Sequence, residues 1–323
     1  MRKKIQHRIN IDKLKLCYVQ PDKLVEALIE QKGSDGVIDY GDYQLFILDH
    51  NDKELVDIDK LTAMLILKGV GKDGSNVKLG SFNFSNSGKY QGRCFFSFAN
   101  EALYFCNSII GGEKYNLMCY LNHVTEQLGL NYNNITEIEI AVDINFNMTR
   151  VIRHFVRLHH QYKMYVNGNL IKDPKARIKN YFEVFGRTRE HLETTPSLYV
   201  KQIGSGIPLQ LKTYNKTEEI EEESPQKQYV KEWNGFPEKD VTHRMEVTIG
   251  NVDFRQWNDF LRSKESTYSK EWADHQMPLD LLMTEEYRWA LWVYATNRLL
   301  YFADRKNHER ITLIDILGGS RPL

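Results

Sequence analysis

Hydrophobic and polar residues alternate most regularly in residues 136–145. Ile138, Ile140, Val142 and Ile144 are separated there by polar or small residues, which is the period of a half-buried β-strand. Side chains two positions apart share one face of a strand, so these four aliphatic residues are expected to face a core. The opposite face of the strand then carries polar side chains.

The same kinds of pattern predict the other elements. Up to residue 130 we expect strands at 12–18, 43–48, 63–67 and 89–98, and helices at 22–31 and 116–128. After residue 145 we expect a helix at 149–166, strands at 197–200, 209–216 and 242–249, and only helices from residue 251, including one at 285–304. This mixture indicates an α+β fold with a C-terminal helical segment.

Length and charge narrow this picture. At roughly 150 residues per domain, 323 residues predict about two domains. We place an N-terminal α+β half at 1–130, a second α+β half at 131–250 and the helical segment at 251–323. Lys plus Arg and Asp plus Glu both number 43, so the chain has no overall charge that favours nucleic acid. Such a partner requires a local basic patch.

The sequence also suggests where the protein works. No stretch reaches the roughly 20 apolar residues of a membrane-spanning helix, and no apolar signal region follows the basic residues 1–8. We therefore expect a cytoplasmic protein without a membrane partner. The four cysteines lie far apart, which favours reduced thiols over a disulfide or zinc framework; they are Cys17, Cys94, Cys106 and Cys119.

Carboxylates gather on the polar face of the strand at 136–145. Glu137, Glu139 and Asp143 share this face, and Glu246 stands on a second alternating strand at 242–249. If the two strands share a sheet, these carboxylates could hold a hard divalent cation, Mg²⁺ or Mn²⁺, which prefers oxygen ligands. The alternative is an acidic, solvated strand face, which the alternation alone also predicts.

The strand at 209–216 adds a candidate nucleophile. Tyr214 and Lys216 are two residues apart and are expected to share a face. A tyrosine hydroxyl has a pKa near 10 and needs a base, a metal or a nearby cation to favour its phenolate, and Lys216 could supply that cation. A buried structural tyrosine is the alternative interpretation.

A basic region follows the acidic strand. Between residues 149 and 189, ten lysines and arginines stand against two carboxylates, with aromatic residues between them. Such a mixture suits single-stranded nucleic acid, because cations hold phosphates and rings stack on bases; a solvated helix face with a basic loop is the alternative. The DNA-binding candidates are Arg150, Arg153, Arg157, Lys163, Lys175, Arg177, Lys179, Tyr181, Arg187 and Arg189.

Four motifs in order resemble the trans-acting rolling-circle replication initiators of small plasmids, together with related relaxases of integrative elements and initiators of filamentous phage. The motifs are Glu-Ile-Ala-Val-Asp at 139–143, Tyr199-Val200 with Gly204-Ser205, Lys-Thr-Tyr-Asn-Lys-Thr-Glu-Glu at 212–219, and Arg-Met-Glu-Val at 244–247. The sequence departs from the family pattern at Glu137 and Lys212, where arginines are expected, and at Glu139, where aspartate is expected. The resemblance covers residues 137–249.

This resemblance implies a replication initiator or relaxase of a mobile element. Such enzymes nick one strand of origin DNA, at a hairpin or single-stranded region, and form a 5′-phosphotyrosine link and a free 3′-hydroxyl for a host polymerase and helicase. It also implies duplicated RRM-like antiparallel sheets and a homodimer. By position, Tyr214 is the nucleophile, Lys216 the adjacent cation, Arg244 a phosphate or carboxylate partner, and Glu139, Asp143 and Glu246 the ligands of Mg²⁺ or Mn²⁺; Tyr199 is the alternative nucleophile.

A non-catalytic protein that binds single-stranded nucleic acid with the same fold is the alternative. In that case Tyr181, Phe182 and Tyr199 stack bases. The two functions differ in one structural requirement, since only the nickase needs Tyr214 and the carboxylates of Glu139 and Glu246 to converge.

Overall fold

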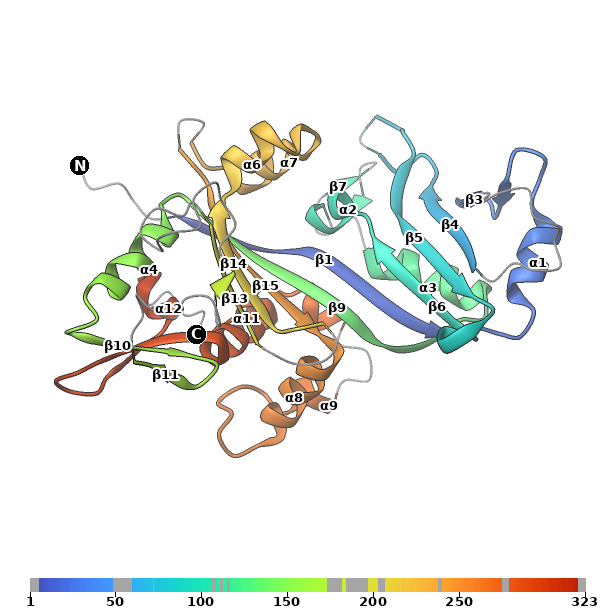
Figure 1. Cartoon of the computed structure of the whole chain (residues 1–323). Helices are drawn as coiled ribbons and strands as arrows, with labels where there is room; N and C mark the ends of the chain where they lie inside the picture. The colour runs from blue at the N-terminus through green and yellow to red at the C-terminus, as the bar shows by residue number, and fades with distance from the viewer. Residues whose placement is uncertain are drawn as a thin grey trace. The chain divides into compact units, whose positions relative to one another are not determined.

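The computed structural model is a mixed α+β structure (Figure 1). The chain divides into two compact units, the first formed by residues 1–11 and 139–323 and the second by residues 12–138. The structure describes residues 6–48, 60–71, 73–105, 109–110, 113–114, 117–172, 182–183, 197–202, 207–237, 240–274 and 279–318. The predicted fold class, α+β with antiparallel sheets and packed helices, is confirmed.

The first unit contains the strands that carry the candidate chemistry. They lie side by side in the order β12 (Phe182–Glu183), β13 (Leu198–Lys201), β14 (Gln210–Asn215), β15 (His243–Gly250) and β9 (Asn131–Ile144). The helices between these strands in sequence are α4 (Met148–Arg157), α6 (Lys216–Glu222) and α7 (Tyr229–Asn234). As predicted, Ile140, Val142 and Ile144 are fully buried.

A second, smaller sheet in this unit corrects two predicted helices. The predicted helix at 149–166 ends at Arg157, and residues 162–166 form strand β10. The helix predicted at 285–304 is likewise shorter than expected: α11 covers Glu285–Leu299, and residues 300–304 form β16. The sheet order is β11 (Asn169–Ile171), β10 (Tyr162–Val166), β16 (Leu300–Asp304) and β17 (Arg310–Ile311). Pairing between β10 and β16 joins segments remote in sequence, so local spacing could not predict it.

The C-terminal part of the first unit is otherwise helical. Its helices are α8 (Asn251–Arg262), α9 (Glu271–Asp274), α10 (Leu279–Leu282), α11 and α12 (Leu313–Ile316). Trp257 and Trp292 are fully buried among them, and such large rings contribute much of a core's apolar area. The segment from residue 251, predicted to contain only helices, thus also contains strands β16 and β17.

The second unit is an antiparallel sheet with helices on one face. Its strands lie in the order β9, β1 (His7–Val19), β6 (Arg93–Phe98), β5 (Val77–Ser85), β4 (Lys60–Leu67), β3 (Tyr43–Leu48) and β2 (Val37–Asp39). The helices are α1 (Leu24–Gln31), α2 (Asn100–Tyr104) and α3 (Leu117–Gln127), and β7 (Ile109–Ile110) pairs with β8 (Glu113–Lys114). The hydroxyl of buried Tyr43 donates to Gln127 of α3, so α3 covers the buried face of this sheet.

Two further predictions concern helices and thiols. Within the described ranges, no helix is long and apolar enough to cross a membrane. Cys17 and Cys94 are buried free thiols and Cys119 is an exposed one, as the spacing of the cysteines predicts. Cys106 lies outside the described residues.

Candidate active site

The strand register of the first unit brings the predicted residues together. In the antiparallel β14–β15 ladder, Lys212 lies opposite Glu246 and Tyr214 lies opposite Arg244. Directly opposite residues point to the same face of a sheet, so all four side chains share one face. Strand β9 lies on the other side of β15 and contributes Glu139.

Hydrogen bonds connect four of these side chains into one group, the Tyr214 cluster, which comprises Glu139, Lys212, Tyr214 and Glu246. The Tyr214 hydroxyl donates to Glu246 Oε2 at 3.1 Å. Lys212 Nζ donates to Glu246 Oε1 at 2.8 Å and lies 3.5 Å from Glu139 Oε1. Thr248 Oγ1 also donates to Glu139 Oε1, at 3.1 Å. The convergence that a nickase requires is therefore present.

Lys212 balances the charge of the cluster. Partial burial lowers the pKa of Lys212, but the carboxylates of Glu246 and Glu139 outweigh burial, and the net result is a raised pKa. The ammonium group therefore stays protonated at neutral pH and compensates one of the two negative charges. Lys212 thus contacts both carboxylates of the cluster.

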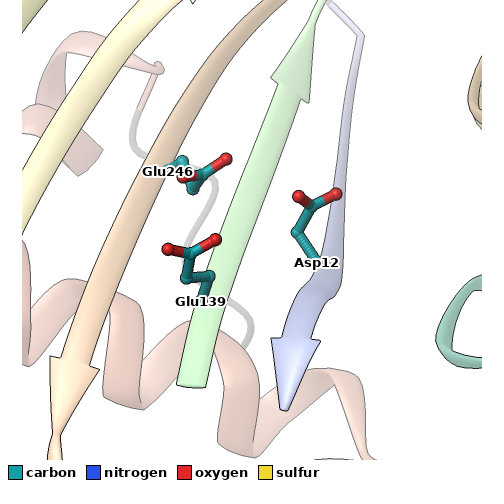
Figure 2. A group of neighbouring side chains, drawn as sticks. All are labelled: Asp12, Glu139 and Glu246. Atoms are coloured by element: carbon teal, nitrogen blue, oxygen red, sulfur yellow. The ribbon is translucent and has the colours of Figure 1, made fainter. Parts of the chain in front are cut away.

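The oxygen atoms of the cluster fit a hard divalent cation. Glu139 on β9 and Glu246 on β15 offer carboxylate oxygens that lie beside each other (Figure 2), and Mg²⁺ and Mn²⁺ prefer such donors. Asp12 of β1, which Figure 2 also labels, belongs to the second unit. The candidate metal site therefore consists of Glu139, Glu246 and their neighbours in the first unit.

Asp143 and Arg244 form a separate ion pair. Arg244 Nε donates to Asp143 Oδ1 and Arg244 Nη2 to Asp143 Oδ2, both at 2.7 Å. Asn234 of α7 donates to the same Oδ2 at 2.9 Å, and the side chains of Asp143 and Arg244 are both 0% exposed. The resemblance implies that Asp143 is a metal ligand and that Arg244 binds a phosphate or a carboxylate. In the structure Arg244 binds a carboxylate, and both oxygens of Asp143 are engaged by protein donors.

Lys216 lies near Tyr214, but not on the strand face where it was predicted. It is the first residue of helix α6, for which Asn215 is the N-cap, rather than a strand residue on the tyrosine's face. Its Nζ nevertheless lies 5.8 Å from the centre of the Tyr214 ring. Lys216 is 1% exposed and its Nζ lies 2.5 Å from Glu219 Oε2, so the nearby cation is itself held by a carboxylate.

Tyr199 stands next to the cluster on β13, where it pairs with Lys212 of β14. Burial raises its pKa, and the negative charge of Glu246 adds to this effect, while Lys212 opposes it. The phenolate of Tyr199 is therefore disfavoured. Tyr199 remains the second candidate nucleophile by position.

Part of the predicted DNA-binding region lies on α4. Arg150, Arg153 and Arg157 are spaced three and four residues apart on this helix, the spacing of neighbours on one helical face. Lys163 lies on β10. The remaining candidates fall outside the described residues; they are Lys175, Arg177, Lys179, Tyr181, Arg187 and Arg189.

Two residues of the site, Lys212 and Thr248, are absent from the residues predicted from the sequence. Lys212 stands in the sequence only as a departure from the family pattern, although its place two residues before Tyr214 puts it on the same strand face. Thr248 shares a strand face with Glu246 by the same rule.

Comparisons with known proteins include a structural likeness but no family model. No family model matches the chain, and no curated protein matches it. A solved structure of a rolling circle replication initiator protein from Geobacillus stearothermophilus aligns with a TM-score of 0.43 and 13% sequence identity. The alignment covers 99% of this chain and 98% of that chain.

Proposed function

We propose that this protein is a replication initiator or relaxase of a mobile genetic element, such as a plasmid, a phage or an integrative transposon. Its reaction would be the nicking of one DNA strand at an origin through Tyr214. The observation that carries the proposal is the hydrogen bond from the Tyr214 hydroxyl to Glu246, within a group that also holds a second carboxylate and an ammonium. A tyrosine nucleophile requires this kind of surrounding.

The proposed reaction is a transesterification. Glu246 accepts the hydrogen bond of the Tyr214 hydroxyl and is placed to take its proton. The phenolate oxygen then attacks the scissile phosphorus, and the bond from phosphorus to the 3′-oxygen breaks. The DNA 5′ end becomes linked to Tyr214 as a phosphodiester, and the 3′-oxygen takes up a proton and leaves as a hydroxyl.

The charges around Tyr214 support this chemistry. Glu139 and Glu246 would hold Mg²⁺ or Mn²⁺, which polarises the phosphodiester and favours the phenolate when bound. Lys212 and Lys216 supply positive charge near the position where the pentavalent phosphorus gathers negative charge. Asp143 and Arg244 fix β9 to β15 and so position Glu139 against Glu246.

The substrate would be origin DNA with a hairpin or single-stranded nick region. Basic residues of α4, together with Lys163, would hold its phosphates. The free 3′-hydroxyl would prime a host polymerase, and a host helicase would unwind the template. A homodimer would suit an origin with two half-sites.

A labelled single-stranded oligonucleotide from the protein's own element tests the proposal. Incubation with Mn²⁺ is expected to give a covalent adduct between protein and DNA on a denaturing gel. Tyr214→Phe removes the attacking oxygen while keeping the ring, so the adduct is expected to disappear. EDTA is expected to abolish the adduct of the unmodified chain, because the metal is removed.

Tyr199→Phe is the matched control, because it removes a neighbouring hydroxyl without touching Tyr214. This variant is expected to form the adduct as the unmodified chain does. An adduct that survives in Tyr214→Phe and is lost in Tyr199→Phe would move the nucleophile to β13. DNA binding without an adduct across the whole origin would contradict the nickase and favour a non-catalytic single-strand binding protein.

A further inference from the structure

Helix α3 covers one face of the sheet of the second unit, and side chains on the other face are partly exposed among the described residues. Along β6, Cys94, Phe96 and Phe98 are buried while the residues between them are partly exposed, and β3 and β4 show the same alternation. The buried face includes Tyr43, which contacts α3 through Gln127 and His123. The partly exposed side chains therefore lie on the opposite face, named here the open sheet face.

The register of the strands shows what lines this face. One row crosses it from Lys15 through Ser97 and Ser81 to Met64 and Phe46. A neighbouring row includes Phe95 and Asn83. Small polar and apolar residues thus occupy the middle of the face, and an aromatic ring stands in each row.

Cations border this middle region. Arg93 and Lys60 belong to one outer row, and Lys78 pairs with Ile66 in another. Two carboxylates of the same sheet have lysine partners, because Glu137 Oε1 lies 2.8 Å from Lys13 Nζ and Asp39 Oδ1 lies 2.8 Å from Lys68 Nζ. Arg93, Lys60 and Lys78 therefore place positive charge along the border.

Aromatic residues and cations also contact one another here. Lys15 Nζ lies 5.1 Å from the centre of the Phe95 ring, and the ring of Tyr90 packs edge-on against Phe95 at 5.5 Å. Tyr90 is 50% exposed, and Lys89 Nζ lies 5.4 Å from its ring centre. Exposed rings beside cations are the features with which proteins bind unpaired bases and the phosphates between them.

We propose that the open sheet face binds single-stranded DNA. Phe95 and Tyr90 contact bases, and Lys15, Arg93, Lys60 and Lys78 contact phosphates. Duplex DNA would bury its bases away from these rings, so the unpaired strand is the form that the aromatic residues select. The choice of DNA as the polymer rests on the proposed function, while the surface itself lies in a different unit from Tyr214.

Fluorescence anisotropy tests this surface with a labelled oligothymidylate of about 20 nucleotides, long enough for a site of the usual size. The full-length chain carries Tyr214→Phe, so that no covalent adduct contributes to the signal. Phe95→Ala is expected to weaken binding about tenfold through the loss of stacking, and Phe95→Tyr is expected to bind like the parent. Replacing Lys15 and Arg93 with alanine is expected to weaken binding and to lower the slope of log K against log salt by about 0.7 for each cation.

Lys32→Ala is the matched charge control, because Lys32 follows α1 and is not on a strand of the sheet. It is expected to bind like the parent. If Phe95→Ala and the double variant both bind the oligonucleotide within about twofold of the parent affinity, the proposal is overturned. This holds even if the open sheet face proves to bind a protein. The binding assay needs no nicking. If the unmodified chain forms no adduct with origin DNA while the open sheet face binds the oligonucleotide as expected, only the proposed function is contradicted.

Discussion

Two polar groups on strands β9 and β15 use the same kinds of side chain in different ways. Asp143 and Arg244 form an ion pair in which both side chains are 0% exposed. Glu139 and Glu246 stand further along the same two strands, with Lys212 as their cation. The Lys212 side chain is 24% exposed, and those of Glu139 and Glu246 are 14% and 5% exposed.

The two groups also differ in how completely their charges are matched. In the buried pair the Arg244 guanidinium donates two hydrogen bonds to the Asp143 carboxylate, and Asn234 donates a third. In the Tyr214 cluster one ammonium serves two carboxylates. A charge-matched buried pair has little capacity for another ligand, whereas the carboxylates of the cluster share one ammonium and are partly exposed. Exposure and charge matching therefore separate a structural pair from a candidate site.

Among the substitutions that test this comparison, Arg244→Met is expected to lower the stability of the protein most. Removing the guanidinium leaves the Asp143 carboxylate buried without its charged partner, which typically costs about 3–5 kcal/mol. We expect the first unit to unfold at much lower urea concentration, as followed by circular dichroism. Glu246→Gln, on the same strand, is expected to cost only about 1 kcal/mol, because Lys212 keeps Glu139 as a partner.

The double variant Asp143→Leu, Arg244→Met is the control for this experiment. Replacing both members of a buried ion pair with apolar side chains is often close to neutral, so most of the stability lost in Arg244→Met is expected to return. Equal destabilisation by Glu246→Gln and Arg244→Met would contradict the distinction between the two groups.

The sequence indicates the convergence of Tyr214 with Glu139 and Glu246 more directly than it indicates the partners of Asp143. Alternation fixes the face of Glu139 and Glu246, and a shared ladder then makes Tyr214 and the carboxylates converge. The partners of Asp143 depend on Arg244, which is 101 residues away, and on Asn234 of α7. Spacing within one strand contains no information about such distant donors, and it could not exclude Asp143 from the ligands.

The prediction of a helix at 149–166 is wrong beyond Arg157 for a related reason. Its apolar residues continue past Arg157 with spacing that suits a helix, but Met164 and Val166 are buried in strand β10. That strand exists because β16 supplies its hydrogen-bonding partner. Pairing with a distant strand therefore overrides the local helical pattern. Such pairing cannot be inferred from the spacing of a short apolar segment.

His243 extends the comparison, because it is a buried polar residue on β15 and has no charged partner among the residues that the structure describes. Burial lowers its pKa from 6.5 to about 4. The unfolded chain binds a proton below about pH 6.5 and the folded chain does not until about pH 4, so stability falls as the pH falls through this window. We expect a loss of about 2 kcal/mol between about pH 7 and pH 5, measured by urea unfolding.

His243→Gln is expected to remove this dependence on pH, because glutamine does not titrate. The matched control is His160→Gln, at an exposed position of the same unit, which is expected to keep the pH profile of the parent. An unchanged profile in His243→Gln would contradict the assignment of the proton to His243.

Lys212→Gln tests the remaining feature of the comparison, which is the single ammonium between two carboxylates. Without it, Glu139 and Glu246 repel each other, and a divalent cation no longer competes with Lys212 for their oxygens. We expect Mn²⁺ alone to bind about tenfold more tightly, equivalent to about 1.4 kcal/mol, by isothermal titration calorimetry. Lys163→Gln makes the same change of charge on β10 and is expected to leave Mn²⁺ affinity unchanged. Equal Mn²⁺ affinities in all three chains would mean that the metal does not use the oxygens held by Lys212, and Glu139 and Glu246 would then form a closed ion-pair group like Asp143 and Arg244.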